Sequence, residues 1–356
     1  MMAYFQERKE RISAWLQELF RSSAGSFGRV NPLGRELGER LLRFALQGKM
    51  LRGGLVSLGA GLAHDPAREA VDPEMETRAG AAMELLQSGL LVHDDIMDRD
   101  TVRRGQPTIF YQYAADAERG GARDAYHLGE ALGICAGDVA YFLAFEVLAG
   151  LPAAVAAGIS GLCARELALV GVAQMQDVSW GAAAVEAGAE DILRLYTYKT
   201  GRYTFSLPLL AGALLAGGGP ELLARLERVG ECLGVLFQIR DDELGLFGDE
   251  QELGKPVGSD IREGKKTLFY ATLLRRAEAE TRSRLAGIFG NPGIGAEEIC
   301  FVQSELERLG VRREVAEVAA TYEKEARRLI AELPEGRSGE RRLVGDLLRY
   351  TQERTR

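Results

Sequence analysis

Two pairs of adjacent aspartates end strongly apolar runs of this chain. Asp94 and Asp95 follow GLLVH, and Asp241 and Asp242 follow LGVLFQIR. A helix that is apolar nearly all round is buried, and charges at its end cost several kcal/mol unless they are paired or bound to metal. Asp98 lies one helical turn after Asp94, so these two carboxylates share a helix face, about 5 to 6 Å apart at Cβ. Such neighbours repel, which raises one pKa, unless a divalent cation holds both.

Magnesium is the cation that this pattern favours. The surrounding sequence, LVHDDIMDRD, offers carboxylates and no cysteine. A hard, oxygen-only magnesium site typically keeps several waters and takes its remaining ligands from substrate phosphates. The aspartates therefore predict a magnesium-dependent enzyme that acts on a diphosphate.

Composition excludes several other classes of protein. The 356 residues are 46% hydrophobic, enough for one large core or two modest ones. A formal net charge of −8 without a long run of Lys or Arg argues against nucleic acid or an anionic membrane as the main partner. The four cysteines are widely spaced without CxxC, which favours reduced thiols. The N-terminus does not resemble a signal peptide, and no apolar run reaches about 18 residues. We expect a soluble, cytoplasmic protein without stable membrane insertion.

The elements that must position these side chains are predicted to be helices. Ala, Leu, Glu and Arg dominate, and apolar residues recur at intervals of three and four over 3–20, 34–47 and 221–239, so the fold class is all-α. Gly- and Pro-rich segments are too short for domain linkers. We expect a single domain over 1–356, a bundle of roughly ten or more helices around a central cleft. Two helices facing each other across it would bring both aspartate clusters to one ligand.

Four cations occur in two short motifs near the first aspartate pair. Lys49 and Arg52 stand three apart in GKMLRGG, beside glycines that let backbone approach a ligand. Such a pair more often serves the helix dipole or solvent. Arg103 and Arg104 are adjacent in RRGQPT and point in different directions, so each could hold a phosphate; the alternative is a solvated loop.

Two further segments suit a phosphate site. Lys199 and Thr200 precede Gly201 within an otherwise helical pattern, and a Thr-Gly break can kink a helix and free backbone carbonyls. A kink made only for packing is the alternative. The basic, glycine-rich segment 254–268 directly follows the second aspartate pair, which suits a lid over phosphates. A plain surface loop would look much the same.

Seven motifs in order resemble those of the trans-prenyltransferase (polyprenyl diphosphate synthase) family. They are GKxxR, ExxQ…HDDxxD, RRGxPT, QxxD, KT, FQxxDD and GKxxGxD, and they span residues 48–268. The resemblance implies an all-α fold around a deep cleft, usually a homodimer. It also implies a reaction in which three magnesium ions help join isopentenyl diphosphate to an allylic diphosphate.

The resemblance assigns metal-binding roles to the aspartates. It implies that Asp94 and Asp98 hold two magnesium ions against the allylic diphosphate, with Asp95 supporting them. It implies that Asp241 holds the third ion, with Asp242 in its water shell.

The resemblance also implies which side chains face the allylic substrate. Cations that contact its diphosphate are Arg103, Lys199 and Lys255. Oxygen dipoles of Thr200 and Gln238 face the carbocation. Gln174 and Asp177 match a helical pair near the second metal site, although Ala173 replaces the usual glycine.

A separate set of side chains matches the isopentenyl diphosphate site of the family. They are Lys49, Arg52, Gln87 and Arg104. Gln87 stands where many members have histidine, which keeps a hydrogen-bond donor and removes a titrating group.

The second aspartate motif departs from the family pattern. Gly245 occupies the place of its fifth-position aspartate, one turn after Asp241. Asp249 would lie roughly 12 Å along the axis if the helix continued, and is a poor direct substitute. Magnesium commonly retains several waters, so the alternative is an ion that Asp241 and water molecules ligate without a second aspartate. The DDxLGxxGD form resembles one among bacterial geranylgeranyl-type members.

Product length is predicted from the helix that carries the first motif. Gly89 and Leu90, one turn before Asp94, match positions that line the path of the growing tail, where members that stop at C15 have an aromatic side chain. Leu86 and Met83 come next, and their medium size favours C20, geranylgeranyl diphosphate. Farnesyl and longer polyprenyl products remain alternatives. A class I terpene cyclase, a non-catalytic partner subunit and a plain helical scaffold are the rival interpretations.

Overall fold

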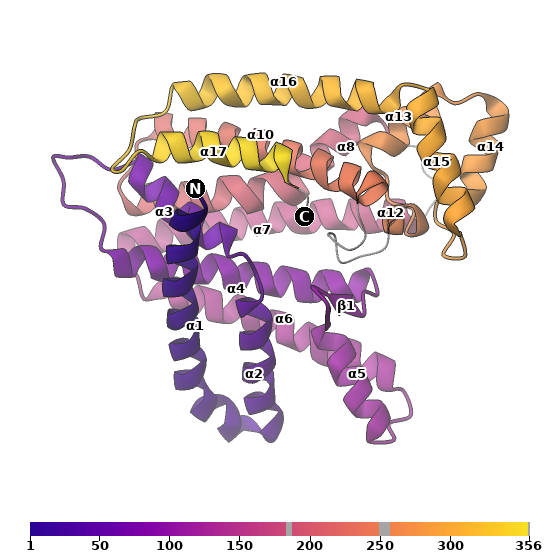
Figure 1. Cartoon of the computed structure of the whole chain (residues 1–356). Coiled ribbons are helices and arrows are strands. Elements are labelled where there is room, and N and C mark those ends of the chain that lie inside the picture. Colours follow the sequence, from indigo (N-terminus) through magenta and orange to yellow (C-terminus); the bar gives the residue numbers. More distant parts are fainter. Residues whose placement is uncertain (183–186, 249–256, 355–356) are drawn as a thin grey trace. The chain divides into compact units, whose positions relative to one another are not determined.

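Nearly all of the chain is helical, as its composition predicts. The computed structural model describes residues 1–182, 187–248 and 257–354 (Figure 1). Two strands of two residues each, β1 (Val102–Arg103) and β2 (Gln106–Pro107), form the only sheet among these residues. The predicted all-α class is confirmed.

The helices belong to two compact units between which the chain passes repeatedly. Unit 1 comprises Met1–Cys163, Pro208–Leu223 and Gly336–Glu340, and unit 2 comprises Ala164–Leu207, Ala224–Glu335 and Arg341–Arg356. The helices that lie wholly or mainly in unit 1 are α1 (Met2–Val30), α2 (Pro32–Leu46), α3 (Leu51–Leu62), α4 (Pro73–Met97), α5 (Ile109–Arg119), α6 (Ala125–Ala149) and α9 (Leu207–Leu215).

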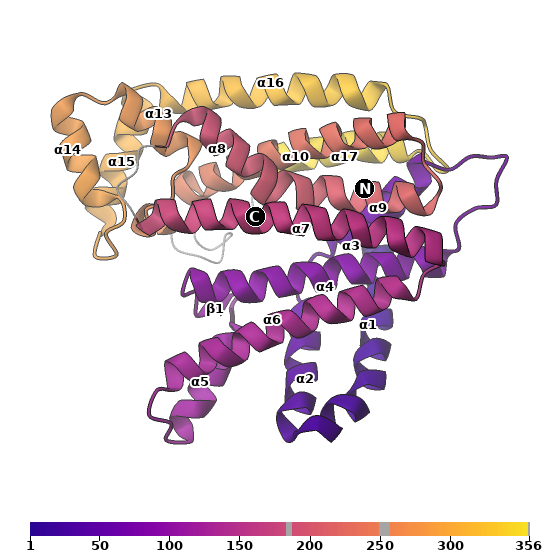
Figure 2. The ribbon, with the colours of Figure 1, turned by 180° about the vertical axis from the view of Figure 1, so that it is seen from behind.

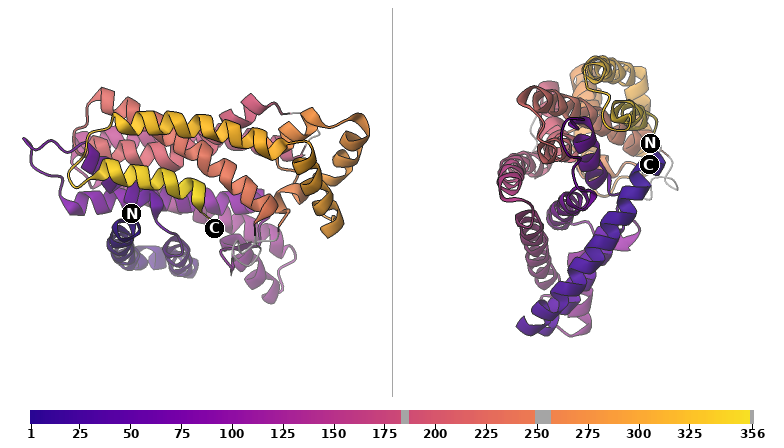
Figure 3. Two further views of the ribbon diagram at one scale, coloured as in Figure 1. Left: turned by 45° about the horizontal axis from the view of Figure 1, so that its top comes forward. Right: turned by 90° about the vertical axis from the view of Figure 1, so that its left-hand side faces the viewer.

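Unit 2 is built mainly on two long helices. They are α7 (Ala153–Ala182), which begins in unit 1, and α10 (Pro220–Phe247). A π-helix, η1 (Tyr196–Ser206), directly follows α8 (Ala189–Leu195). The remaining helices are α12 (Ser259–Arg262), α13 (Leu268–Arg276), α14 (Ala279–Ile288), α15 (Ala296–Arg308), α16 (Val311–Ala331) and α17 (Glu340–Glu353). Figures 1 and 3 show α16 and α17 side by side.

Helix α4 forms the centre of unit 1 and carries the first aspartate pair. It begins at Pro73, where the Asp72 side chain accepts a hydrogen bond of 2.9 Å from the amide of Glu74, a cap that stabilises a helix by about 1 kcal/mol. Most of its length is buried, and it runs beside α6 (Figures 1 and 2). The buried part of α4 ends at its last turn, which carries the partly exposed Asp94 and Asp98.

Two helices are more apolar than the sequence analysis anticipated. Ala125–Ala149 and Ala153–Gly181 are long and apolar enough to cross a membrane, with 44% and 33% of their most apolar windows buried. The expectation that no segment reaches this length and character was therefore wrong. Core helices of soluble proteins have the same composition, so length and hydropathy alone do not establish a membrane span.

Candidate functional site

The first aspartate cluster lies at the C-terminal end of α4. Asp98 caps the helix, and its amide donates to the carbonyl of Asp94 at 2.8 Å, so the two residues are one turn apart as predicted. Asp95 is fully buried. Arg103 Nε donates to Asp95 Oδ1 at 2.5 Å, and Arg103 Nη2 lies 3.6 Å from Asp94 Oδ2. One arginine therefore contacts both adjacent aspartates, and its Nη2 also lies 3.8 Å from Asp100 Oδ2.

Burial decides the ionisation of Asp95. It raises the pKa of the Asp95 carboxyl to about 7, against the opposing attraction of Arg103, and the charges of Asp94 and Asp100 raise it further. Oδ2 of Asp95 is buried and has no hydrogen-bond partner among the described residues. A buried carboxylate oxygen without a hydrogen-bond partner, beside the partly exposed carboxylates of Asp94 and Asp98, suits a residue that supports the direct ligands of a divalent cation.

A tight hairpin separates the two adjacent arginines. Val102 pairs with Pro107 and Arg103 with Gln106, and the two turn residues, Arg104 and Gly105, have φ of 52° and 72°. Positive φ at both positions is the type I′ turn that suits a two-residue hairpin. This geometry directs Arg103 to the aspartates, whereas Arg104 reaches the GKMLRGG segment. The divergence predicted from the sequence is confirmed.

Arg104 joins Lys49 and Arg52 at the start of α3. A Cβ on Gly48 would lie 3.3 Å from Nη1 of Arg104, so the guanidinium rests against the residue before Lys49. Burial lowers the pKa of Arg104, and the neighbouring Arg103 lowers it further. Cations kept this close in a chain with a net charge of −8 favour a bound anion.

One buried carboxylate, Glu84 of α4, partly balances these cations. Glu84 Oε1 accepts from the amide of Gly53 at 2.8 Å, and burial raises the Glu84 pKa against the attraction of Arg52. Gln87 follows one turn later, and its buried Oε1 has no hydrogen-bond partner in the described part of the chain. Glu84 is the first residue of the ExxQ motif, and its buried contact with the amide of Gly53 gives it a structural role.

The residues predicted to set product length divide between two faces of α4. A Cβ on Gly89 would lie 2.7 Å from Cε1 of Tyr141 on α6, so Tyr141 already occupies the space beside this glycine. Leu90 is partly exposed, and Leu86 and Met83 are buried. Tyr141 was missed by the sequence analysis because nothing in the local pattern of α6 connects it to Gly89.

In unit 2, Asp241 of α10 forms an ion pair with Arg354. The Arg354 guanidinium also stacks on Phe237, 3.7 Å from the ring centroid. The backbone carbonyl of Arg354 accepts a hydrogen bond from Arg240 Nε at 3.1 Å. Arg354, close to the C-terminus, therefore lies against the first aspartate of the second pair.

Asp242 is buried within a chain of neutral hydrogen bonds. It accepts from the Tyr196 hydroxyl and, at 2.8 Å, from Gln238 Nε2. Thr200 Oγ1 donates to Gln238 Oε1 at 2.9 Å, and Tyr196 in turn accepts from the amide of Leu268 at 2.8 Å. Burial raises the Asp242 pKa to about 8. The chain connects η1, α10 and α13, and Tyr196 was another residue without a sequence signal.

A carboxylate from another element covers the glycine of the second motif. A Cβ on Gly245 would lie 2.8 Å from Oδ2 of Asp260, and the amide of Gly258 donates to the Gly245 carbonyl at 3.0 Å. Asp260 is the last residue of the GKxxGxD motif, whose aspartate received no role in the sequence analysis. Asp249 and Lys255 lie outside the described residues.

Lys199 and Thr200 lie in a π-helix where the sequence analysis expected a kink. Lys199 forms an ion pair with Asp177 of α7, on the face that also carries the partly buried Gln174. Gly201 permits close packing, since a Cβ on Gly234 of α10 would lie 2.0 Å from the Gly201 Cα. The wide turns extend over 11 residues, and π-helices of this kind often accompany functional sites.

The donor sets fit magnesium with substrate ligands rather than a protein cage. Within 1–182, 187–248 and 257–354, no group of three or more His, Cys, Asp or Glu side chains converges on a metal position. Two carboxylates one turn apart, with a buried third behind them, suit an ion that completes its shell with water and phosphate oxygens.

Comparisons with known proteins agree with this chemistry. The family model of polyprenyl synthetase matches residues 36–303. The chain is 35% identical to a short chain isoprenyl diphosphate synthase of Methanothermobacter thermautotrophicus, over 74% of this chain and 76% of that one. It is 30% identical to a nonaprenyl diphosphate synthase of Mycobacterium tuberculosis, over 87% and 84%.

A solved structure matches nearly the whole chain. It is the geranylgeranyl pyrophosphate synthase of Corynebacterium glutamicum, in complex with isoprenyl diphosphate and magnesium. The TM-score is 0.90 at 28% identity, covering 99% of this chain and 98% of that one. The fold expected from the motifs is therefore confirmed.

Proposed function

The chain belongs to the polyprenyl synthetase family and is a prenyl diphosphate synthase, a trans-prenyltransferase, and from this premise we propose that it extends allylic diphosphates to geranylgeranyl diphosphate. One observation carries the reaction class. The hairpin turn sends Arg103 to an acidic cluster and Arg104 to a cationic one. These are the two kinds of site that two diphosphate substrates need, one of them metal-assisted and the other cationic.

The acidic side of the hairpin is proposed to hold the allylic diphosphate. Asp94 and Asp98, and separately Asp241, would hold magnesium, three ions in all, with Asp95 and Asp242 supporting them. Bound magnesium neutralises negative charge as the diphosphate leaves. Arg103 in unit 1 and, separately, Lys199 in unit 2 are proposed to supply fixed positive charge for the allylic diphosphate. Each is already held by an aspartate, so little ordering is needed when substrate binds.

The cationic side is proposed to hold isopentenyl diphosphate. Lys49, Arg52 and Arg104 bind its phosphates, and Gln87 adds a neutral donor. The allylic C1–O bond breaks, the isopentenyl double bond forms the new carbon–carbon bond at C1, and the released diphosphate accepts the proton that is lost. Oxygen dipoles of Thr200 and Gln238 favour the transient cation without attacking it.

The proposed C20 product rests on positions 89 and 90 of α4, where glycine and leucine stand in place of an aromatic side chain. Met83 and Leu86 are of medium size, and the C. glutamicum structure is named a geranylgeranyl synthase. Tyr141 of α6 lies beside Gly89 and would narrow the path of the growing prenyl tail. Farnesyl and longer products are the alternatives.

We also propose a homodimer, formed through apolar faces of α6 and α7. On α6, Ile134 and Phe142 are 47% and 71% exposed and share a face, being eight residues apart. On α7, Val172, Met175 and Val178 recur at intervals of three and are at least 42% exposed. Exposed apolar surface of this kind marks an interaction site, and a second copy would cover it.

The two compact units are proposed to form one domain. The family match from 36 to 303 includes most of both units, and the chain crosses between the units after residues 163, 207, 223, 335 and 340. Such interleaving favours a single polyprenyl synthase domain over 1–356. We propose that the protein is a soluble enzyme of this family with a cytoplasmic location.

The test is a primer panel with the purified full-length protein. Magnesium and isopentenyl diphosphate are supplied with dimethylallyl, geranyl or farnesyl diphosphate, and product length is measured by mass spectrometry. A C20 product supports the proposal, whereas a C15 stop or products of C30 and beyond overturn the length assignment. Elongation absent with every primer overturns the reaction itself.

A single substitution sharpens the length test. Leu90→Phe adds an aromatic ring at a partly exposed position, so the product should shorten toward C15. The same change at Gly89 would collide with Tyr141 and is unsuitable. Leu33→Phe, which adds the same ring at an exposed position on α2, is the control and should leave product length unchanged.

A further inference from the structure

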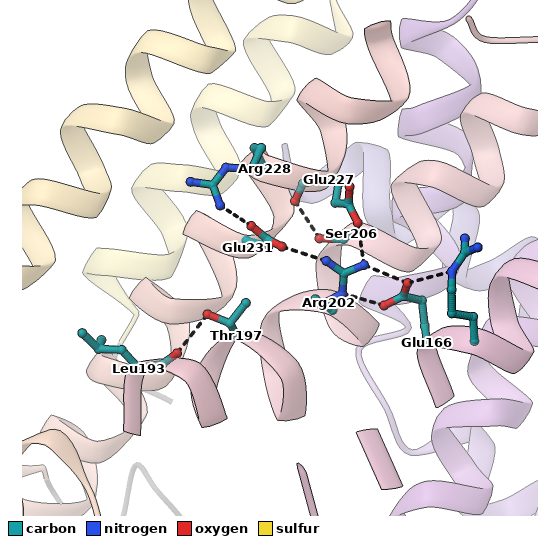
Figure 4. A network of polar contacts seen from close by, with 9 residues as sticks. Glu166, Leu193, Thr197, Arg202, Ser206, Glu227, Arg228 and Glu231 are labelled. Atoms are coloured by element: carbon teal, nitrogen blue, oxygen red, sulfur yellow. Dashed lines mark hydrogen bonds and ion pairs between the residues drawn. The ribbon is translucent and has the colours of Figure 1, made fainter. Parts of the chain in front are cut away.

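A buried ion network holds η1 from the side of α7 and α10 (Figure 4). Arg202 Nε and Nη2 donate to the two oxygens of Glu166 at 2.7 and 2.9 Å. Nη1 donates to Glu231 Oε1 at 2.8 Å, and Nη2 also donates to Glu227 Oε1 at 2.5 Å. Glu166 belongs to α7, and the other two glutamates belong to α10. One guanidinium therefore binds three carboxylates from two helices.

The centre of this network is desolvated, whereas its rim is not. The side chains of Arg202 and Glu166 are 14% and 2% exposed. Arg228 pairs with Glu231 at 2.6 Å but is 60% exposed, and Arg165, 3.7 Å from Glu166, is 68% exposed. Exposed pairs contribute little to stability. Removing one partner of a buried pair leaves an uncompensated charge, so Arg202 is the member on which the network depends.

The element that Arg202 holds needs external support. A π-helix is rare and usually limited to one turn, yet η1 extends from Tyr196 to Ser206. Its backbone meets α10 at the contact of Gly201 with Gly234, and Ser206 Oγ donates to the Glu227 carbonyl at 2.8 Å. Arg202 lies between these two contacts. Tertiary contacts thus select the wide turns over an ordinary α-helix.

Two residues proposed for the allylic half of the reaction share this π-helix. Lys199 and Thr200 precede Arg202 by three and two positions. Lys199 pairs with Asp177 of α7, and Thr200 donates to Gln238 of α10. Arg202 therefore binds the same two helices against which these side chains are aligned. A change of register in η1 would redirect both of them, because side-chain direction follows the helical period.

We propose that Arg202 is a positioning residue for the allylic substrate, which it serves by holding η1 in its π-helical register. The guanidinium fork ties η1 to Glu166 on one helix and to Glu227 and Glu231 on the other. Lys199 and Thr200 keep their directions as a result. This inference rests on the proposed function, since it gives those two side chains their substrate.

Steady-state kinetics of Arg202→Gln test the proposal. We expect kcat to fall by about 10- to 100-fold, the loss that follows a small misplacement of catalytic groups, and the KM for the allylic diphosphate to rise. The KM for isopentenyl diphosphate should stay at the wild-type value, because its proposed cations lie on other elements. Arg202→Lys keeps the charge without the fork and should restore part of the loss.

Arg228→Gln is the matched control. It removes an arginine from the same network at an exposed position and leaves the fork on η1 intact. Its kcat and both KM values should match those of the wild type. Equal losses in Arg202→Gln and Arg228→Gln would overturn the proposal, because the network would then act only through general stability.

Hydrogen exchange separates positioning from the chemistry. In substrate-free Arg202→Gln, backbone amides of residues 196–206 should exchange at least about tenfold faster than in the wild type, whereas those of α4 should not change. If that variant fails to fold, Glu227→Gln, which loses the more exposed of the α10 carboxylates, should show a smaller change in the same direction. Wild-type exchange in residues 196–206 of the folded variant would overturn the proposal.

Wild-type turnover and hydrogen exchange in the variant test two different proposals, so either proposal can be overturned without the other. Wild-type turnover reports on the proposed prenyl transfer, and exchange in residues 196–206 reports on Arg202. A variant that loses kcat only in proportion to its unfolded fraction, with both KM values unchanged, would also overturn the positioning role.

Discussion

The two aspartate pairs have the same sequence form, and the structure satisfies their buried members in opposite ways. Asp95 is 0% exposed and Asp242 is 4% exposed. Asp95 accepts from a guanidinium, Nε of Arg103 at 2.5 Å. Asp242 accepts from two neutral groups, the Tyr196 hydroxyl and the Gln238 amide. One carboxylate is thus paired with a charge, and the other sits in a neutral hydrogen-bond chain.

The two aspartates within each pair also differ from each other in exposure and in pKa. In both clusters the first aspartate is more exposed, with side-chain exposures of 25% for Asp94 and 46% for Asp241, and it is the one that we propose as a metal ligand. The second is buried, which raises the pKa of Asp95 to about 7 and that of Asp242 to about 8. The buried aspartate of each pair holds the end of its helix through its hydrogen bonds. The charge of its hydrogen-bond donors determines the net charge at that helix end.

The largest effect is expected from removing a carboxylate of the exposed kind. Asp94→Asn should lower kcat by about 1,000-fold, because a lost metal ligand weakens transition-state charge stabilisation by several kcal/mol. Thermal unfolding should change little, since Asp94 is partly exposed. Asp65→Asn, at an exposed position of unit 1, is the control for a lost surface carboxylate. Turnover of Asp94→Asn within tenfold of the wild type would contradict the metal assignment.

The buried members should respond differently to loss of their partners. Arg103→Gln leaves Asp95 without its cation and should cost about 3 kcal/mol of unfolding free energy at a pH where Asp95 is ionised. Tyr196→Phe removes one neutral donor and should cost about 1 to 2 kcal/mol. Urea unfolding measures both. Equal costs would mean that the charge of Arg103 adds nothing beyond a hydrogen bond.

The glycine of the second motif permits a carboxylate exchange. Gly245→Asp places a side chain against Asp260 and should destabilise the fold by about 1 to 3 kcal/mol through crowding and like charge. Adding Asp260→Gly should recover most of that loss and keep kcat within about tenfold, because one carboxylate replaces the other. A double variant no more stable than Gly245→Asp would show that Asp260 does not take the place of the missing aspartate.

The last expected effect is a pH dependence of the stability of the metal-free protein, at most about 1.4 kcal/mol per pH unit. Asp242 has a raised pKa of about 8 in the folded state and about 3.9 when unfolded. Between these values the folded protein keeps a proton that the unfolded chain has lost. Stability contributed by this group therefore falls as pH rises through that window. Asp242→Asn should flatten the slope in urea unfolding, and an unchanged slope would assign it to other groups.

Much of the fold and of the reaction class was predictable from the sequence. Helical periodicity and composition specified the all-α class, because those patterns are local and repeat within each helix. The aspartate spacing specified a magnesium-dependent diphosphate enzyme, because metal binding needs particular side chains at particular spacings, and the resemblance of the seven motifs to a known family identified it as a prenyltransferase. The spacing of Asp94 and Asp98 alone placed both on one turn of α4, as the structure shows.

The residues that the sequence analysis missed are partners from other helices. Asp260 approaches Gly245 across 15 residues, Tyr196 reaches Asp242 across 46, and Tyr141 reaches Gly89 across 52. The predicted kink at Lys199 became a π-helix for the same reason, since carboxylates of α7 and α10 hold Arg202. The sequence by itself determined which groups are present and in what local order. Tertiary structure decided which of them meet, because burial leaves each carboxylate to the donors that packing brings within hydrogen-bond distance.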